Sequence, residues 1–360
     1  MDPTRRAFLT SLAVAMEGPM TAATVDEGVY RHPSFQPDPR IGAISRDLAA
    51  PLHNATIRDP LRIIKEGEAD LSNGCSLEID GKIAGDLAVS IDDFQRFLTV
   101  SLGIPKEKAS YPLRLRTGTA EGCPAGASEA FHARIEASGG TIIAPDADGL
   151  RRALIHLEDE MSIRRGPYLP LGPVSHWAVV EDRITHSPVA PYRWLSGWEL
   201  EQDGDFYPDE YLNKLVHCGM NGIWVAGLLS RLVATKTLPE LGPKEHRLER
   251  LRNLTERARR YGIRVFLFCI EPRSMPADHP VFAAHPEIRG AGGQCLCVST
   301  PLVKDYIREV MRELFAAVPL LAGVINIYKG ERTTTCWMSE KLVQSCPRCR
   351  TRPQVEVIAE

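Results

Sequence analysis

The second half of the sequence alternates apolar runs with helical patterns, and this alternation limits the available folds more than any other feature. A short apolar segment at residues 194–200 is followed by three longer runs, which begin at Ile223, Ile263 and Val324. The helical patterns between them cover residues 208–217, 245–262 and 300–323. Four strands alternating with three helices specify a parallel sheet with right-handed crossovers.

The first half has a different order of elements. Strand patterns at residues 75–80, 112–118 and 130–145 surround a helical stripe that Ser90 begins and Gly103 ends, and a long helix follows that reaches Met161. This order predicts an α+β layer with its helices on one face of the sheet. We therefore expect an α/β protein with an α+β domain at residues 26–190 and a barrel-type sheet at residues 191–360.

The length of the second region bears on whether its sheet closes. A closed (β/α)₈ barrel typically needs about 250 residues, whereas residues 191–360 supply about two thirds of that. The sequence therefore predicts the first half of a (β/α)₈ barrel, in a chain that is a truncated product of a longer gene. A compact open sheet is the alternative.

Charge and hydropathy exclude several kinds of partner. The 360 residues carry 43 Lys and Arg against 46 Asp and Glu, for a net charge of -3, which does not indicate a nucleic-acid partner. No stretch approaches the roughly 18 apolar residues that would span a bilayer. A small or neutral partner fits this chain best.

The N-terminus carries a possible export signal. Arg5 and Arg6 precede Phe8, Leu9 and a short apolar run, so residues 1–25 resemble a twin-arginine signal that directs export. An amphipathic N-terminal helix or a misplaced start codon, in a cytoplasmic protein, is the alternative.

The stretch from Gly323 to Trp337 supplies a candidate catalytic acid. Its apolar run leads into Gly330 and Glu331, as a buried parallel strand does when it delivers a carboxylate to its solvent-facing end. An ordinary loop start is the alternative. Glu271 follows the preceding strand and is a candidate second carboxylate at the same face, unless it is a surface carboxylate paired with Arg273.

The order of several segments resembles a known family. GGTIIAPDADGLRRALIHLEDEM, RITHSPVAPYRW, NKLVHCGMNGIWV, ERARRYGIRVFLF and STPLVKDYIREVMRELF occur in this order before a strand that ends in Gly-Glu. Over roughly residues 85 to 350 this is similar to the N-terminal domain and first barrel half of the family 20 β-N-acetylhexosaminidases. It is also similar to α-glucuronidase-type and endo-N-acetylglucosaminidase-type barrel hydrolases.

The resemblance implies a glycoside hydrolase that needs no cofactor or metal, with Glu331 as general acid and Arg193 binding sugar hydroxyls. In the family an Asp that orients the substrate's acetamido group precedes the acid, and a His lies four residues before that Asp. Here these places hold Gly330 and Asn326, which favours a different glycoside or a different nucleophile.

Sugar binding also needs aromatic platforms, because the apolar face of a pyranose packs on a ring. Besides Arg193, the predicted substrate-binding residues are Trp194, Trp198, Asn326, Arg332 and Trp337. Trp224 fits the core better than a sugar subsite. The rival hypotheses are a non-catalytic carbohydrate-binding or remnant protein and an open α/β domain with no sugar function.

The sequence contains nine cysteines, and the last two form a Cys-x-x-Cys motif. Cys336, Cys346 and Cys349 resemble three ligands of a structural zinc knuckle, for which Cys295, Cys297 or a histidine is the fourth. A disulfide or unpaired thiols are the other interpretations, and unpaired thiols are the primary expectation.

Overall fold

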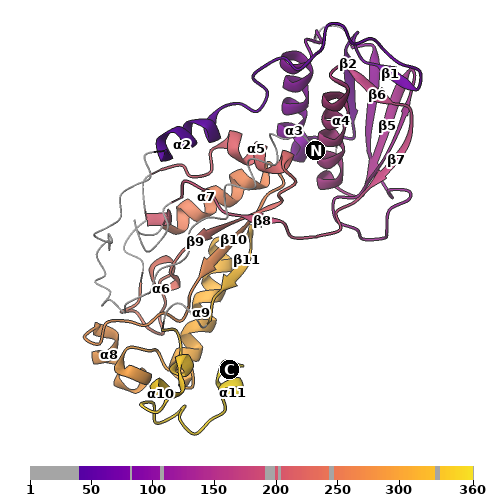
Figure 1. The fold of residues 1–360 in the computed structure, drawn as a ribbon. Helices are drawn as coiled ribbons and strands as arrows, with labels where there is room; N and C mark the ends of the chain where they lie inside the picture. Colours follow the sequence, from indigo (N-terminus) through magenta and orange to yellow (C-terminus); the bar gives the residue numbers. More distant parts are fainter. Residues whose placement is uncertain are drawn as a thin grey trace.

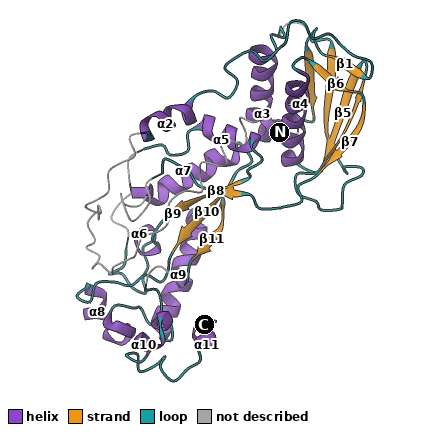
Figure 2. Cartoon of the chain, viewed as in Figure 1, coloured by secondary structure: helices purple, strands orange, loops and turns teal. Residues whose placement is uncertain are grey.

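The computed structural model describes residues 40–359 except 82, 106–108, 191–198, 202–203, 243–246 and 329–332. Within these residues the chain forms two layered units, each built on its own sheet, as Figure 1 and Figure 2 show. The expected signal segment, residues 1–25, lies outside the described residues. Among the helices that are described, none combines the length and the apolarity needed to cross a bilayer.

The N-terminal unit is a five-stranded sheet with two helices on one face (Figure 1). Its elements are β1 (Glu68–Asp70), β2 (Cys75–Ile79), α3 (Ala84–Arg96), β3 (Tyr111–Thr117), β4 (Phe131–Glu136), β5 (Gly139–Ala144), α4 (Ala147–Arg164), β6 (Tyr168–Pro170) and β7 (Gly172–His176). The strand order is β2-β3-β5-β4-β7, in which β4 runs antiparallel to both neighbours, and β1 pairs with β6 in a separate ribbon.

Side-chain periodicity explains this unit. Alternate residues of β3 are buried, and α4 buries Leu150, Leu154, Leu157 and Met161 at a spacing of three or four residues. The expected strands and long helix are therefore present. The expected start of the first helix at Ser90 is wrong, because the buried stripe includes Leu87 and α3 begins six residues earlier, at Ala84.

The second unit is a four-stranded parallel sheet in the order β11-β10-β9-β8. Its strands are β8 (Ile184–Thr185), β9 (Gly222–Ala226), β10 (Arg264–Cys269) and β11 (Leu321–Asn326). Its helices are α5 (Asp209–His217), α6 (Leu229–Leu232), α7 (Arg247–Arg259), α8 (Pro280–Ala284), α9 (Pro301–Ala317), α10 (Glu340–Val343) and α11 (Gln354–Ile358), and α2 (Ile41–Ala49) packs on α5. The strands are therefore neighbours in the sheet in the same order in which they occur along the sequence.

The two faces of this sheet differ in burial. Ile223, Val225, Val265 and Leu267 are at most 1% exposed and share one hydrophobic core with residues of α5, α7 and α9. The alternate residues Trp224, Phe266 and Phe268 are partly exposed. The helices therefore cover one face, and the aromatic rings line the other.

The first strand of this sheet lies in an unexpected place. Ile184 and Thr185 pair with Gly222 and Ile223, ahead of the apolar segment at residues 194–200 in which the sequence predicts the first strand. Of the apolar segment at residues 194–200, only Glu199 and Leu200 are described, and they begin a short 3₁₀ turn. A strand of two residues is too short to leave a period in the sequence.

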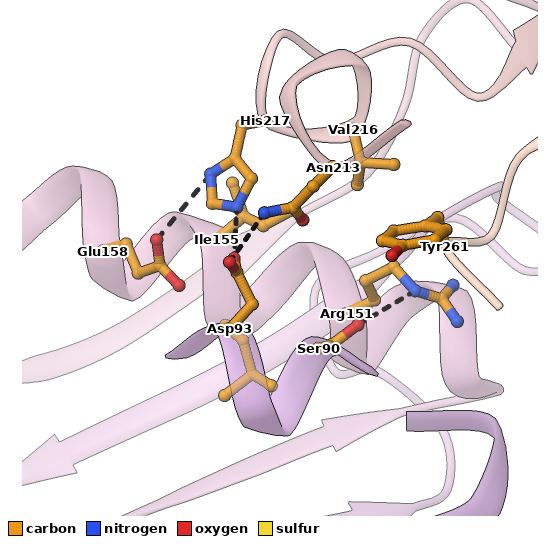
Figure 3. A pocket seen from close by; sticks show the side chains of 10 residues that line it. Ser90, Asp93, Arg151, Ile155, Glu158, Asn213, Val216, His217 and Tyr261 are labelled. Atoms are coloured by element: carbon orange, nitrogen blue, oxygen red, sulfur yellow. Dashed lines mark hydrogen bonds and ion pairs between the residues drawn. The ribbon is translucent and has the colours of Figure 1, made fainter. Parts of the chain in front are cut away.

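A buried charge cluster joins the two units (Figure 3). Asp93 on α3 accepts hydrogen bonds from Asn213 at 2.6 Å and His217 at 2.8 Å, both on α5. His53 lies 3.3 Å from Asp93 and 3.4 Å from Glu158 on α4. Because His217 precedes β9, this cluster and the pocket beside it lie at the amino ends of the parallel strands.

A second buried network makes the same junction. Glu129 accepts from Arg152 at 2.9 Å and from Asn221 at 3.0 Å, and it also pairs with Arg183. Asn221 additionally accepts the backbone N–H of Arg183 at 2.9 Å. Removing one member of such a buried pair is strongly destabilising, since the other charge stays buried without its partner.

The charge cluster makes folding depend on pH. Burial disfavours the charged form of His53, but bonds to Asp93 and Glu158 outweigh it and raise the pKa of His53 from 6.5 to about 9. Burial likewise opposes ionisation of Asp93, but His217 and His53 lower its pKa below the ordinary 3.8. The contribution of His53 is thus present below pH 6.5 and lost as pH rises through about 9, while that of Asp93 is lost as pH falls below 3.8.

We expect Asp93→Asn to lower the free energy of unfolding at about pH 6 by about 3 kcal/mol, because two buried histidines lose their anionic partner. The penalty should shrink at about pH 9.5, where His53 is neutral. Urea unfolding followed by tryptophan fluorescence at both pH values measures this. Asp92→Asn, at an exposed position of the same helix, is the control and should change neither value. Equal penalties for Asp93→Asn at the two pH values would contradict the account.

Candidate active site

The carboxyl ends of the four parallel strands meet at one edge of the sheet. The loops that follow them carry α6, α8 and α10, which Figure 1 shows on the side of the sheet away from the N-terminal unit. Backbone hydrogen bonds hold the strand ends together. The Gly227 N–H donates to the carbonyl of Phe268 at 3.0 Å, and the Ile327 N–H donates to the carbonyl of Cys269 at 2.9 Å. Ligands of parallel α/β sheets bind at this end.

Glu271 is a buried acid at this edge. It follows β10, is 6% exposed, and its carboxylate accepts the backbone N–H groups of Leu229 at 2.9 Å and Arg273 at 2.6 Å. Burial raises the pKa of Glu271 from 4.5 to about 7, against the opposing effect of these bonds. The interpretation of Glu271 as a surface carboxylate is therefore wrong, and a carboxyl group that titrates near neutral pH suits acid–base chemistry.

Asn326 holds the backbone of Glu271 in place. Its side-chain oxygen accepts the N–H of Glu271 at 2.9 Å, and its amide nitrogen donates to the carbonyl of Glu271 at 3.0 Å. Because β10 and β11 are neighbours, the end of one strand thereby positions the acid that follows the other. Asn326, predicted to bind sugar, uses these two atoms to position Glu271.

A second buried acid lies beside the first two strands. Glu199 is 4% exposed and bonds the ring of His186 at 2.7 Å, and burial raises its pKa although the His186 bond opposes this. The His186 ring stacks on Trp224 with centroids 3.9 Å apart, and Trp224 contacts Phe268 at 4.7 Å. His186 and Glu199 are not among the site residues predicted from the sequence. The only sequence signal for them is that His186 directly follows β8, a strand too short to be recognised.

Five predicted site residues lie outside the described residues, namely Glu331, Arg332, Arg193, Trp194 and Trp198. Tyr328 and Thr333, on either side of the undescribed residues 329–332, are described. The Thr334 hydroxyl donates to the carbonyl of Tyr328, and the carbonyl of Thr333 accepts the N–H of Ser274 at 3.0 Å. The two ends of this segment are thus joined to each other and to the loop after β10.

Trp337 is partly exposed and packs against the hydrophobic core of the second unit. Its backbone N–H donates to the Thr335 hydroxyl at 3.1 Å, which caps the short turn at Cys336–Met338. The structure therefore gives Trp337 a packing contact with the core, whereas the sequence predicts a sugar-binding role.

Two groups of described side chains have the spacing of metal ligands. One is the charge cluster of His53, Asp93, Glu158 and His217, whose members bond one another at the unit junction. The other is a set of four buried thiols on the carboxyl-end side of the second sheet, namely Cys297, Cys336, Cys346 and Cys349.

No protein-family model matches the chain, and no curated protein is similar to it in sequence. Solved structures do resemble it. A Flavobacterium johnsoniae chitobiase (FjGH20) has a TM-score of 0.51 at 19% identity, covering 82% of this chain and 48% of the chitobiase. A GH138 enzyme targeting pectin rhamnogalacturonan II also has a TM-score of 0.51, at 18% identity over 71% of this chain and 30% of that enzyme.

These likenesses define a GH20-like fold, as the resemblance in the sequence predicts. At these identities the likeness is one of fold. The chain spans about half the length of the chitobiase and less than a third of the GH138 enzyme.

We expect Glu271→Gln to flatten the pH dependence of stability between about pH 4.5 and 7. With its pKa raised from 4.5 to about 7, Glu271 favours the folded state when protonated, and this contribution declines as pH rises through that range by about 3 kcal/mol. Urea unfolding at several pH values measures the slope. Glu287→Gln, at an exposed position of the same loop, is the matched control. A Glu271→Gln variant with the wild-type slope would show that Glu271 titrates normally.

Proposed function

We propose that the protein is a glycoside hydrolase that cleaves O-glycosidic bonds in a glycan or polysaccharide, with Glu331 as the general acid. The observation that carries this proposal is the buried acid Glu271 at the carboxyl end of β10, in a fold similar to that of a chitobiase. The surroundings of Glu271 hold a carboxyl group with a pKa near neutral, which is the property that glycoside cleavage requires of its general acid and that this proposal extends to Glu331.

The order in which the strands pair favours a partial barrel rather than an open doubly wound sheet. Strands that pair in chain order, with their connecting helices on one face, follow the winding of a (β/α)₈ barrel. A doubly wound sheet instead reverses its strand order and is covered on both faces. In this proposal Trp224, Phe266 and Phe268 face the barrel interior.

The roles follow from the strand ends. Glu331 protonates the leaving oxygen at the end of the fourth strand, and Arg193 binds hydroxyls of the terminal sugar. Glu271 is a positioning residue, because its carboxylate joins the loops after β9 and β10 through the N–H groups of Leu229 and Arg273. Trp194, Trp198, Arg332 and the partly exposed Trp337 complete the sugar site.

The substrate class follows from the residues around the acid. Gly330 stands where the hexosaminidase pattern has the acetamido-orienting Asp, and Asn326 stands where it has a His. Without that Asp the substrate's acetamido group has no partner to orient it as the internal nucleophile. The proposed substrates therefore include glycosides that lack an acetamido group, such as uronic acid or neutral sugar units of a polysaccharide.

We expect Glu331→Gln to reduce kcat/KM for glycans by about 10²- to 10⁴-fold, the range of a general acid. Substrates whose leaving group needs no proton, such as dinitrophenyl glycosides, should lose much less. Release of reducing ends from a panel that includes chitooligosaccharides and rhamnogalacturonan II fragments measures the first effect, and absorbance of the released phenolate measures the second.

Glu340→Gln, at an exposed position of α10, is the control for this experiment and should keep wild-type rates. Equal losses on both substrate kinds would exclude proton donation by Glu331. If the wild-type protein and Glu331→Gln both bind sugars with equal affinity and neither releases product, the protein is a carbohydrate-binding module instead.

A further inference from the structure

Four buried thiols from distant parts of the chain converge on one point. Cys297 precedes α9, Cys336 lies in the turn after β11, and Cys346 and Cys349 follow α10. All four side chains are 0% exposed, and their sulfur atoms lie within 4.8 Å of one another. The cluster therefore joins the loop that follows β10 to the segment that follows β11.

The spacing of the sulfurs matches a tetrahedral metal ion. With Zn–S bonds of about 2.3 Å, the edge of the tetrahedron is about 3.8 Å. Cys297 lies 3.8 Å from Cys346 and 3.6 Å from Cys349, sulfur to sulfur. A disulfide needs about 2.05 Å and joins only two sulfurs, so it leaves two of the four buried thiols unexplained.

Donor groups surround the sulfurs, as a site for thiolates requires. Arg348 donates to Cys297 at 3.4 Å, and the backbone N–H of Ala291 donates to Cys336 at 3.4 Å. The Ser299 hydroxyl lies 3.4 Å from the sulfur of Cys349. Four thiolates and one divalent cation carry a net charge of -2, and the guanidinium of Arg348 offsets part of it.

A fifth cysteine marks the limit of the site. Cys295 is as deeply buried as the four others, but its thiol donates to the carbonyl of Thr335 at 3.5 Å and does not belong to the group. Among the described residues, Cys297 and not Cys295 is therefore the fourth member of the group. The sequence alone left this choice open.

We propose that Cys297, Cys336, Cys346 and Cys349 bind one Zn²⁺ ion, which fastens the segment after β11 to the loop after β10. The four-sulfur set of a closed tetrahedral site favours a structural zinc. On binding, the four thiols give their protons to solvent and no electrons are transferred. The zinc site adds to the proposed hydrolase and does not depend on it.

The test is the metal content of the full chain. Protein purified from zinc-supplemented cells without chelator should hold about one zinc per chain by plasma mass spectrometry, released in step with titration of thiols by a mercurial. Exchange into Co²⁺ should give thiolate-to-cobalt charge transfer and the d–d bands of a tetrahedral site. Cys349→Ser and Cys346→Ser should lose most of the zinc, while Cys295→Ser should retain it.

Several results would overturn the proposal. Wild-type protein with less than about 0.2 zinc per chain under these conditions would do so, even if the serine variants fail to fold. So would iron at one per chain, or a Cys–Cys linkage among the four in peptides alkylated before digestion. Zinc that is retained in Cys349→Ser and lost in His217→Gln would place the ion at the unit junction instead.

Discussion

The parallel pairing of β8, β9, β10 and β11 in chain order is the constraint on which the second unit depends. Since every strand runs the same way, every connection returns across the helix-covered face and every strand ends at the same edge. That edge brings together Glu271 and Asn326, which are 55 positions apart and share two hydrogen bonds. It also brings the loop before α9 within reach of the segment after β11, where the four thiols meet.

The amino ends and the carboxyl ends of the strands of this sheet carry different kinds of side chains. At the amino ends, the Asp93 and Glu129 networks bind the N-terminal unit to α5 and to the start of β9 with charges that satisfy one another. At the carboxyl ends, Glu271 and Glu199 are buried acids whose pKa values burial raises, and partly exposed aromatic rings lie beside them. Barrel enzymes divide stability and chemistry between the two ends of the sheet in this way, and the proposed function places the chemistry of this protein at the carboxyl ends.

Local patterns in the sequence predict much of this fold but little of the site. Pro208 and Gly219 bracket α5, and Thr300 and Pro301 begin α9, because caps and turns act within a few residues. The burial of Glu271 depends on Leu229, 42 positions away, and the choice of Cys297 depends on Cys349, 52 positions away. Such pairings arise only when the sheet forms, and the two residues of β8 leave no period to detect.

The most direct test of the account is a crystal structure of the Glu331→Gln protein with an uncleaved oligosaccharide from the glycan panel. The account predicts a sugar ring at the carboxyl ends of β9, β10 and β11, with the scissile oxygen within hydrogen-bond distance of residue 331. A sugar bound in the pocket at the unit junction, or at the edge but remote from residue 331, would contradict it.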